Sequence, residues 1–199
     1  MLVIHPNDKC TSLARAIYTD LDARIVDPED YESGMVQTLL QTPTDELVLM
    51  IGYGDCHGLY LRYSEEIRLT PSMLDNPTWF QGIDACMKRY AVSTLHVQSL
   101  RRHNGNIVGI WPGAMEFAQR NMLHGLFTDN FVYNHIDAER LGTITLDMHI
   151  DEANLTLYRT LGKLISQHVP LCKIPDLLAE NICEKPNIIS ANYESFTWL

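Results

Sequence analysis

The sequence has few of the features that mark exported, membrane-spanning or metal-binding proteins. Its five cysteines are odd in number and widely spaced, and no two form a C-x-x-C pair, which argues against a disulfide framework and a zinc knuckle. The apolar run from Met1 to Ile4 is too short for a signal sequence and has no basic residue before it. No run approaches the roughly 20 apolar residues that a membrane-spanning helix needs. We therefore expect a cytoplasmic protein with reduced thiols and no membrane association.

Basic charge is also scarce. The 199 residues include 15 Lys and Arg against 25 Asp and Glu, which gives a formal net charge of -10. The basic clusters, Lys88-Arg89 and Arg101-Arg102-His103, are short. Because such a surface repels a phosphate backbone, we expect no nucleic-acid partner. The acidic residues are spread along the chain, which is typical of a soluble surface rather than of an interaction tail.

Complete catalytic motifs are missing as well. The chain contains no Walker loop, no G-x-G-x-x-G element, no G-x-S-x-G turn and no H-E-x-x-H helix. The sequence thus gives no reason to expect a cofactor. It also leaves open whether the protein is an enzyme.

What the sequence does contain is an alternation of short apolar strands and amphipathic helices. Buried strands are predicted over residues 2–5, 46–52 and 106–111, a further short strand over 24–27, and a hairpin or extension over 58–69. Helices are predicted through Leu13 to Leu21, over 30–41, 84–102 and 114–121, from Asp151 to Val169, and from Pro175 to Glu184. The apolar tail from Ile188 is expected to dock onto the body. This pattern predicts a single α/β domain over residues 1–199, a three-layer α/β/α sandwich with a mainly parallel sheet.

The turn from Gly52 to Gly58 follows the clearest strand. Its three glycines permit close backbone approach, and it presents an acid, a thiol and an imidazole together. In doubly wound sheets ligands bind outside the carboxyl ends of the strands, where this turn and the turn at 111–114 are expected to lie. Glycines that serve only the geometry of a tight turn are the alternative. The candidate ligand-binding residues are Tyr53, Asp55, Cys56, His57 and Trp111.

Cys56 and His57 are adjacent, which is unfavourable for a nucleophile and its base. Side chains of neighbouring residues in an extended segment diverge, whereas the two groups need to lie about 3 Å apart. A hydrolase that uses this turn would therefore need a partner from elsewhere, such as His5 or Glu116. We keep this cysteine- or histidine-dependent hydrolase as the alternative function.

Three segments resemble motifs of a little-characterised group of small bacterial α/β proteins with a caspase-like layout. They are Gly52-Tyr53-Gly54 with Gly58-Leu59, Ile110-Trp111-Pro112-Gly113-Ala114, and Asp151-Glu152-Ala153-Asn154. Such proteins carry a Gly-His-Gly turn, an Ile-Trp-Cys-Asn-Ala turn and a late Glu-Ala/Ser-Asn helix, and in caspase-like peptidases the His is the base and the Cys the nucleophile. The resemblance implies a caspase-like or flavodoxin-like sheet.

The sequence departs from this pattern at both catalytic positions. Tyr53 stands in place of the histidine and Pro112 in place of the cysteine. Tyrosine, with a pKa of about 10, is a poor general base at neutral pH, and proline offers no nucleophile. The resemblance therefore implies a non-peptidase relative that binds a small molecule or a protein partner.

Asp147-x-His149-x-Asp151 has the spacing of residues on one face of a strand, which could hold a metal. The apolar residues Ile144, Leu146, Met148 and Ile150 alternate with polar ones, however, as in a half-buried strand. We favour the strand and predict no metal site. For His5, at the end of the first strand, we favour a buried, hydrogen-bonded position.

Overall fold

A computed structural model describes residues 1–6, 10–26, 34–61, 90–142, 145–180 and 187–199. Within them lies a six-stranded sheet of order β2-β1-β3-β7-β8-β9, in which only β9 is antiparallel to its neighbour. The strands are β1 (Leu2–Ile4), β2 (Arg24–Val26), β3 (Val48–Ile51), β7 (Ile107–Ile110), β8 (Leu126–Thr128) and β9 (Phe196–Trp198). The five parallel strands have the 2-1-3-4-5 order of flavodoxin-like sheets.

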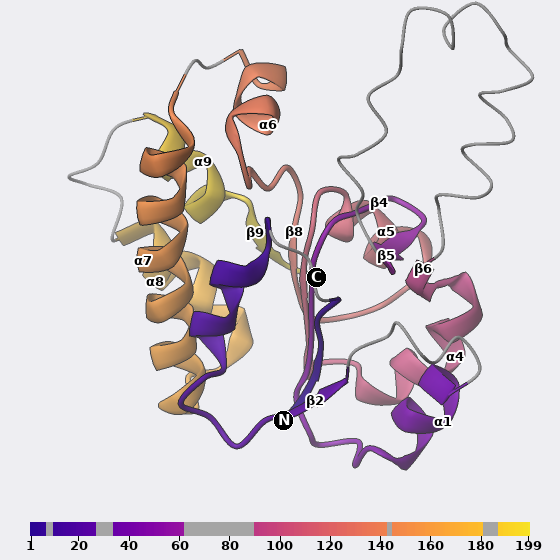
Figure 1. Cartoon of the computed structure of the whole chain (residues 1–199). Coiled ribbons are helices and arrows are strands. Elements are labelled where there is room, and N and C mark those ends of the chain that lie inside the picture. The colour runs from indigo at the N-terminus through magenta and orange to yellow at the C-terminus, as the bar shows by residue number, and fades with distance from the viewer. Residues whose placement is uncertain (7–9, 27–33, 62–89, 143–144, 181–186) are drawn as a thin grey trace, which may run out of the picture.

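Helices cover both faces of this sheet (Figure 1). One face carries the 3₁₀ helix η1 (Ser12–Ile17) with α7 (Asp147–Ser166), α8 (Ile174–Glu180) and α9 (Asn187–Glu194), and η5 (Leu171–Lys173) precedes α8. The other face carries α1 (Gly34–Gln41), α4 (Val97–Leu100) between η3 (Thr94–His96) and η4 (Arg101–His103), and α5 (Ala114–Arg120). The short helix α6 (His135–Arg140) stands at the edge where the parallel strands end. The predicted three-layer sandwich is confirmed.

A second, antiparallel sheet extends from the end of β3. It consists of β4 (Gly54–Asp55), β5 (Gly58–Tyr60) and β6 (Tyr90–Ser93), in that order. The predicted turn at 52–58 is therefore a tight hairpin, with Asp55 paired to Gly58.

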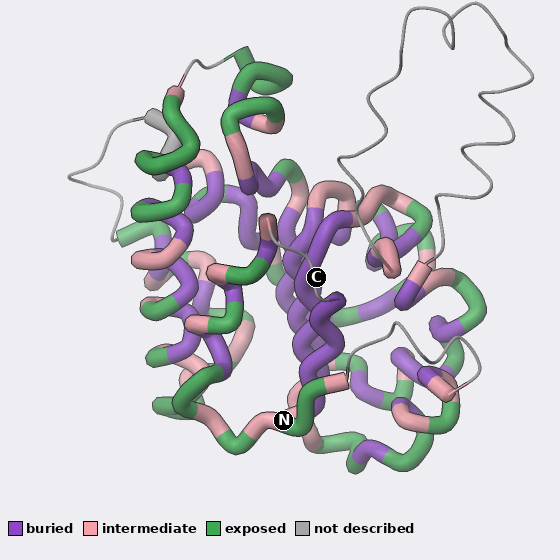
Figure 2. Tube along the Cα trace, in the orientation of Figure 1, coloured by how far each residue is buried: buried purple, intermediate pink, exposed green. Residues whose placement is uncertain are grey.

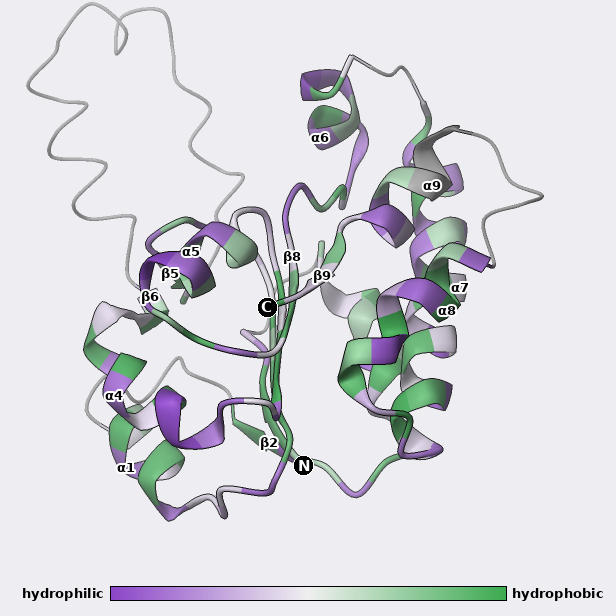
Figure 3. Cartoon of the chain, turned by 180° about the vertical axis from the view of Figure 1, so that it is seen from behind, coloured by the Kyte–Doolittle hydropathy of each residue, from purple (hydrophilic) through white to green (hydrophobic). Residues whose placement is uncertain are grey.

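The strands β1, β3, β7 and β8 are buried on both faces of the sheet (Figure 2), whereas the edge strand β2 is largely exposed. In β3, Val48 and Met50 pack on the side of α1, while Leu49 and Ile51 pack on the side of α7. All four are buried, which explains why the strand is a continuous apolar run rather than an alternating one. The outer helices mix hydrophilic and hydrophobic residues (Figure 3). None of the helices within the described residues is long and apolar enough to cross a membrane.

Gly109, in the middle of β7, admits two large aromatic side chains. A Cβ atom at this position would lie 2.7 Å from Cδ1 of Phe127 and 2.8 Å from Cζ3 of Trp111. Both rings are fully buried. The two rings thus fill the space that a side chain at position 109 would occupy.

Two sequence predictions are wrong. The helix predicted over 84–102 is instead strand β6 followed by short helical turns, and residues 84–89 lie outside the described ones. Ser93 ends the strand, because its hydroxyl accepts a hydrogen bond from the Leu95 N–H and caps the first turn.

The half-buried strand predicted around 143–150 is also wrong. Helix α7 begins at Asp147, four residues before the predicted cap, and residues 143 and 144 lie outside the described ones. Ile150, Leu157 and Leu161 are buried on one side of this helix. The helical spacing of apolar residues therefore already begins at 147–150, where the sequence shows alternating apolar and polar residues.

Candidate functional site

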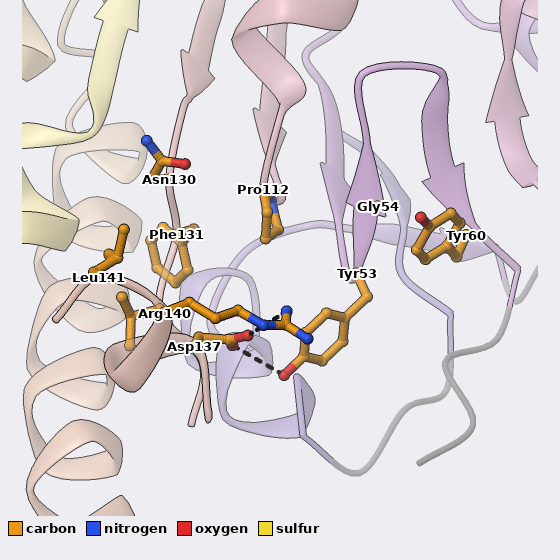
Figure 4. Close-up of a pocket in the computed structure, with 10 residues that line it drawn as sticks. Tyr53, Gly54, Tyr60, Pro112, Asn130, Phe131, Asp137, Arg140 and Leu141 are labelled. Atoms are coloured by element: carbon orange, nitrogen blue, oxygen red, sulfur yellow. Dashed lines mark hydrogen bonds and ion pairs between the residues drawn. The ribbon is translucent and has the colours of Figure 1, made fainter. Parts of the chain in front are cut away.

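A pocket of about 380 Å³ opens at the edge of the sheet where the parallel strands end (Figure 4). It lies beyond β3, β7 and β8, which is where doubly wound sheets bind ligands. The hairpin after β3, the turn after β7, the segment after β8 and helix α6 all contribute to it. Its lining residues are Tyr53, Gly54, Tyr60, Pro112, Asn130, Phe131, Val132, Asp137, Arg140 and Leu141.

Tyr53 joins the hairpin to helix α6. Its side chain is buried, and its hydroxyl donates a hydrogen bond to Oδ2 of Asp137 at 3.3 Å. The same hydroxyl accepts a hydrogen bond of 2.7 Å from the Asn134 amide. Asn134 in turn caps α6, since its Oδ1 accepts the backbone N–H of Asp137 at 3.0 Å. Both hydrogen bonds of the Tyr53 hydroxyl therefore connect it to the N-terminal residues of α6.

Asp137 is the fixed charge of the pocket. Its side chain is 12 % exposed, and its Oδ2 also accepts the backbone N–H of Tyr133 at 3.0 Å. Burial raises the pKa of this carboxyl, and the hydrogen bond from Tyr133 and the positive charge of Arg140 offset the rise only in part. The other oxygen, Oδ1, lies 3.7 Å from Nη1 of Arg140. A backbone hydrogen bond from Asn134 to this carboxyl also lowers its pKa.

Aromatic rings form the floor behind these polar groups. The ring of Tyr133 is tilted against Tyr53 at 4.8 Å and against Phe131 at 4.9 Å between centroids. Its hydroxyl lies 3.1 Å from the carbonyl oxygen of Gly52 and 2.9 Å from that of Ile110, and donates toward both. The last residues of β3 and β7 are thereby tied to the segment that leads into α6.

Helix α6 is attached to the body by polar contacts and a small apolar cluster. Ala138 packs with Val132 and Ile150, apart from the two main cores. At its start, the backbone N–H and the ring Nδ1 of His135 lie 2.6 Å and 2.9 Å from Oδ1 of Asp147. The pKa of Asp147 is lowered, mainly because it accepts the hydrogen bond of this backbone N–H. Helix α6, which carries Asp137 and Arg140, is therefore fixed both at its N-terminus and on its buried face.

Asp55 supports the pocket without lining it. Its carboxylate accepts hydrogen bonds from the Tyr60 hydroxyl at 3.0 Å and the Tyr90 hydroxyl at 3.2 Å. It also accepts the backbone N–H of His57 at 2.7 Å, which closes the hairpin. The acid predicted as a ligand contact therefore orients Tyr60, which does line the pocket.

Trp111 is fully buried and interlocks the two predicted turns. Its Nε1–H donates to the carbonyl oxygen of Asp55 at 3.1 Å. A Cβ on Gly54 would lie 2.3 Å from Cδ1 of this indole, so only glycine lets the hairpin approach so closely. Gly113 has φ of +84°, and a Cβ there would lie 2.9 Å from the backbone N of Cys56. The turns at 52–58 and 111–114 meet, but Trp111 serves as their support and Pro112 faces the pocket.

The residues of the alternative hydrolase are placed differently. His57 is exposed and Cys56 half-buried at the tip of the hairpin, and neither lines the pocket. His5 is buried as predicted, with Nδ1 at 2.8 Å from the Tyr18 hydroxyl and Nε2 at 3.0 Å from Oγ1 of Thr11. Glu116 is an exposed residue of α5 and forms an ion pair with Arg120. The structure thus shows no contact among these residues.

The residues considered for a metal site lie on helix α7. Asp147 and Asp151 are one turn apart, while His149 projects from another side of the helix. Asp147 is occupied by His135. In the described part of the chain, no three acidic, cysteine or histidine residues are grouped as a metal ion would require.

Most residues of the site were not found from the sequence, among them the polar residues Asn134, Asp137 and Arg140. A helix start was readable there, since Asn134 precedes a helix and an acid follows three residues later. That signal indicates only where a helix begins. It does not indicate that the helix faces Tyr53, which lies 81 residues earlier in the chain.

Fold and pocket together define a doubly wound α/β protein with a site at the carboxyl edge of its sheet. No family model, curated protein or solved structure matches the chain. Its function is therefore inferred from the site itself.

Proposed function

We propose that this chain is a non-peptidase binding domain that holds a small organic ligand in the pocket between the 52–58 hairpin and helix α6. The observation that carries this proposal is the convergence of Tyr53, Asp137 and Arg140 on one cavity. The concave wall places these polar groups beside apolar side chains, a combination that ligand sites use to orient and hold their ligands. The volume of about 380 Å³ suits a ligand of the size of a single aromatic compound or sugar.

The resemblance to caspase-like proteins is part of this proposal. In its support, Tyr53 and Pro112, which stand at the positions of the family's histidine and cysteine, line the same pocket. The two positions follow the adjacent parallel strands β3 and β7, which brings them to the same edge of the sheet. We infer that the chain retains the location of a caspase-like site and uses it for binding.

The chemistry of the pocket favours binding over hydrolysis. Among the described residues that line it there is no cysteine, serine or histidine. The tyrosine is already hydrogen-bonded to Asp137 and Asn134. Without a nucleophile and its base, covalent catalysis of the peptidase kind has no starting point. The contacts among the described residues give the alternative hydrolase no support.

The proposal is tested by filling the pocket. Leu141 lines it and is 48 % exposed, so that Leu141→Trp places an indole at the rim without disturbing a core. We expect compounds detected in a ligand-observed NMR screen to lose at least about tenfold in affinity for this variant, because the indole occupies their space.

The matched control is Leu95→Trp. Leu95 is 82 % exposed and does not line the pocket, so this variant adds the same side chain to the surface elsewhere. Binding to it should equal binding to the unmodified protein. A screen without hits, or hits that bind both variants equally well, would contradict the proposal.

A further inference from the structure

The two charged residues of the pocket differ in how firmly they are held. The Oδ2 atom of Asp137 is fixed by the backbone of Tyr133 and the hydroxyl of Tyr53. The side chain of Arg140 is 71 % exposed, and its one charged contact among the described residues is with Asp137, at 3.7 Å. That distance is longer than a hydrogen bond. The carboxylate is therefore the permanent feature of the site, and the guanidinium can be displaced into solvent.

The carboxylate has no cation at hydrogen-bonding distance among the described residues. Nη1 of Arg140 lies 3.7 Å from Oδ1, although the Asp137 side chain is only 12 % exposed. A charge that is largely removed from water is stabilised by a paired opposite charge. A donor that approached Oδ1 more closely than Arg140 does would stabilise it.

The rest of the pocket suits a cation as well. The aromatic rings of Tyr53, Tyr60 and Phe131 line it, and the faces of such rings attract positive charge. The net charge of -10 favours the approach of cations over that of anions. Arg140 itself reaches across the pocket toward Asp137 and Tyr53, which shows that a planar guanidinium fits there (Figure 4).

We infer that the pocket selects a small planar organic cation, an amidinium or guanidinium compound, which pairs with Asp137 in place of Arg140. This inference rests on the proposed binding function and specifies its ligand class. Arg140 then acts as a built-in competitor, since its guanidinium occupies the position that the ligand's charge takes.

The test uses benzamidine with benzamide, its neutral counterpart of nearly equal shape, and with benzoate, the corresponding anion. Isothermal titration calorimetry or chemical-shift titration gives the three affinities. We expect benzamidine to bind at least about tenfold more tightly than benzamide, and benzoate to bind no better than benzamide.

Two variants should change the affinity for benzamidine in opposite directions. Asp137→Asn keeps an oxygen for Tyr53 and Tyr133 but removes the charge, so that benzamidine should lose its advantage over benzamide. Arg140→Ala removes the competitor, and affinity should rise about threefold to fivefold, as expected for the loss of an exposed ion pair. Arg120→Ala is the control, because Arg120 pairs with Glu116 on α5 and removing it changes the net charge equally. That variant should not change the affinity.

Each contrary result has a distinct meaning. Tight binding of benzoate that Arg140→Ala abolishes would show an anion site, which overturns the cation inference and leaves the binding function standing. Equal binding of benzamidine and benzamide, or failure of benzamidine to bind while other compounds respond to Leu141→Trp, would also overturn it. If no compound responds to Leu141→Trp, the proposed function itself fails.

Discussion

At the scale of single residues, His5 is a buried titratable group outside the pocket. Its ring lies between the hydroxyls of Tyr18 and Thr11, below the surface at the end of β1. Burial, helped by the nearby charge of Arg15, lowers its pKa from 6.5 to about 4. The fold therefore holds the neutral imidazole, and protonation opposes folding.

This shift predicts a dependence of stability on pH. As the pH falls from 6.5 toward 4, the unfolded chain takes up the proton before the folded one does, so the free energy of unfolding decreases. The full loss is about 3 kcal/mol and is complete once the pH is below about 4. Urea unfolding at a series of pH values measures it.

His5→Gln serves as the comparison, because glutamine fills the site without titrating. The difference in unfolding free energy between the two proteins should change across this interval and be constant above pH 7. Parallel curves for the two proteins between pH 4 and 6.5 would contradict the assignment.

The sequence predicted single residues of the site unevenly. Tyr53 was found because glycines flank it at the end of a readable strand, and position along a strand is a local property. Asp55 and Trp111 were also singled out, but whether they face a ligand or support the turn depends on contacts with Tyr60, Tyr90 and each other. Such contacts join distant parts of the chain. Local patterns carry no information about them.

At the scale of elements, the segment between β8 and α6 is held by a buried amide network. The side chain of Asn192, on α9, accepts the backbone N–H of Val132 at 2.8 Å and donates to its carbonyl oxygen at 2.8 Å. It also donates to Oδ1 of Asn154, on α7, at 2.7 Å. Two helices are thus joined to the segment that supplies Asn130, Phe131 and Val132 to the pocket.

Asn192→Ala is expected to lower the free energy of unfolding by about 3 kcal/mol, because it leaves buried polar groups unsatisfied. Denaturant unfolding measures the loss, and hydrogen exchange should show that the Val132 amide is no longer protected. Glu194→Ala, at an exposed position of the same helix, is the control. An effect no larger than that of the control would show that the network does not stabilise this segment.

The helices and strands were mostly predictable where an element is covered on both faces or on one clear face. The strands of the main sheet that are covered on both faces appear as continuous apolar runs, and β1, β3 and β7 were found. The errors occurred where a short segment satisfies two periodicities. Residues 90–93 suit a helix by their apolar content, and only pairing with β5 makes them a strand. Residues 147–150 alternate like a strand, and only the docking of Ile150 with Val132 and Ala138 shows their helical face.

At the scale of the whole molecule, the sheet is completed by its last strand. β9 runs antiparallel to β8, and Leu199 and Gly125 exchange backbone hydrogen bonds of 2.9 Å and 3.3 Å. Because bonded pairs alternate along an antiparallel ladder, Thr197 and Phe127 form the next bonded pair. The backbone N–H of Thr197 is therefore directed at β8.

Thr197→Pro removes this donor and leaves the carbonyl oxygen of Phe127 without its partner. We expect the free energy of unfolding to fall by about 2 kcal/mol, as measured by urea denaturation. Thr197→Val retains the N–H and a β-branched side chain, and should unfold close to the unmodified protein. Equal behaviour of the two variants would mean that β9 contributes little to the fold.

Gly109 restricts the substitutions that this chain can accept in evolution. Phe127 and Trp111 occupy the space next to its Cα, and the indole of Trp111 also holds the hairpin through Asp55. A descendant that acquired a side chain at position 109 would need smaller residues at 111 and 127 at the same time. We therefore expect the three positions to change together. Because Trp111 also supports the hairpin that follows Tyr53, we expect divergence of the binding site to be constrained from inside the sheet.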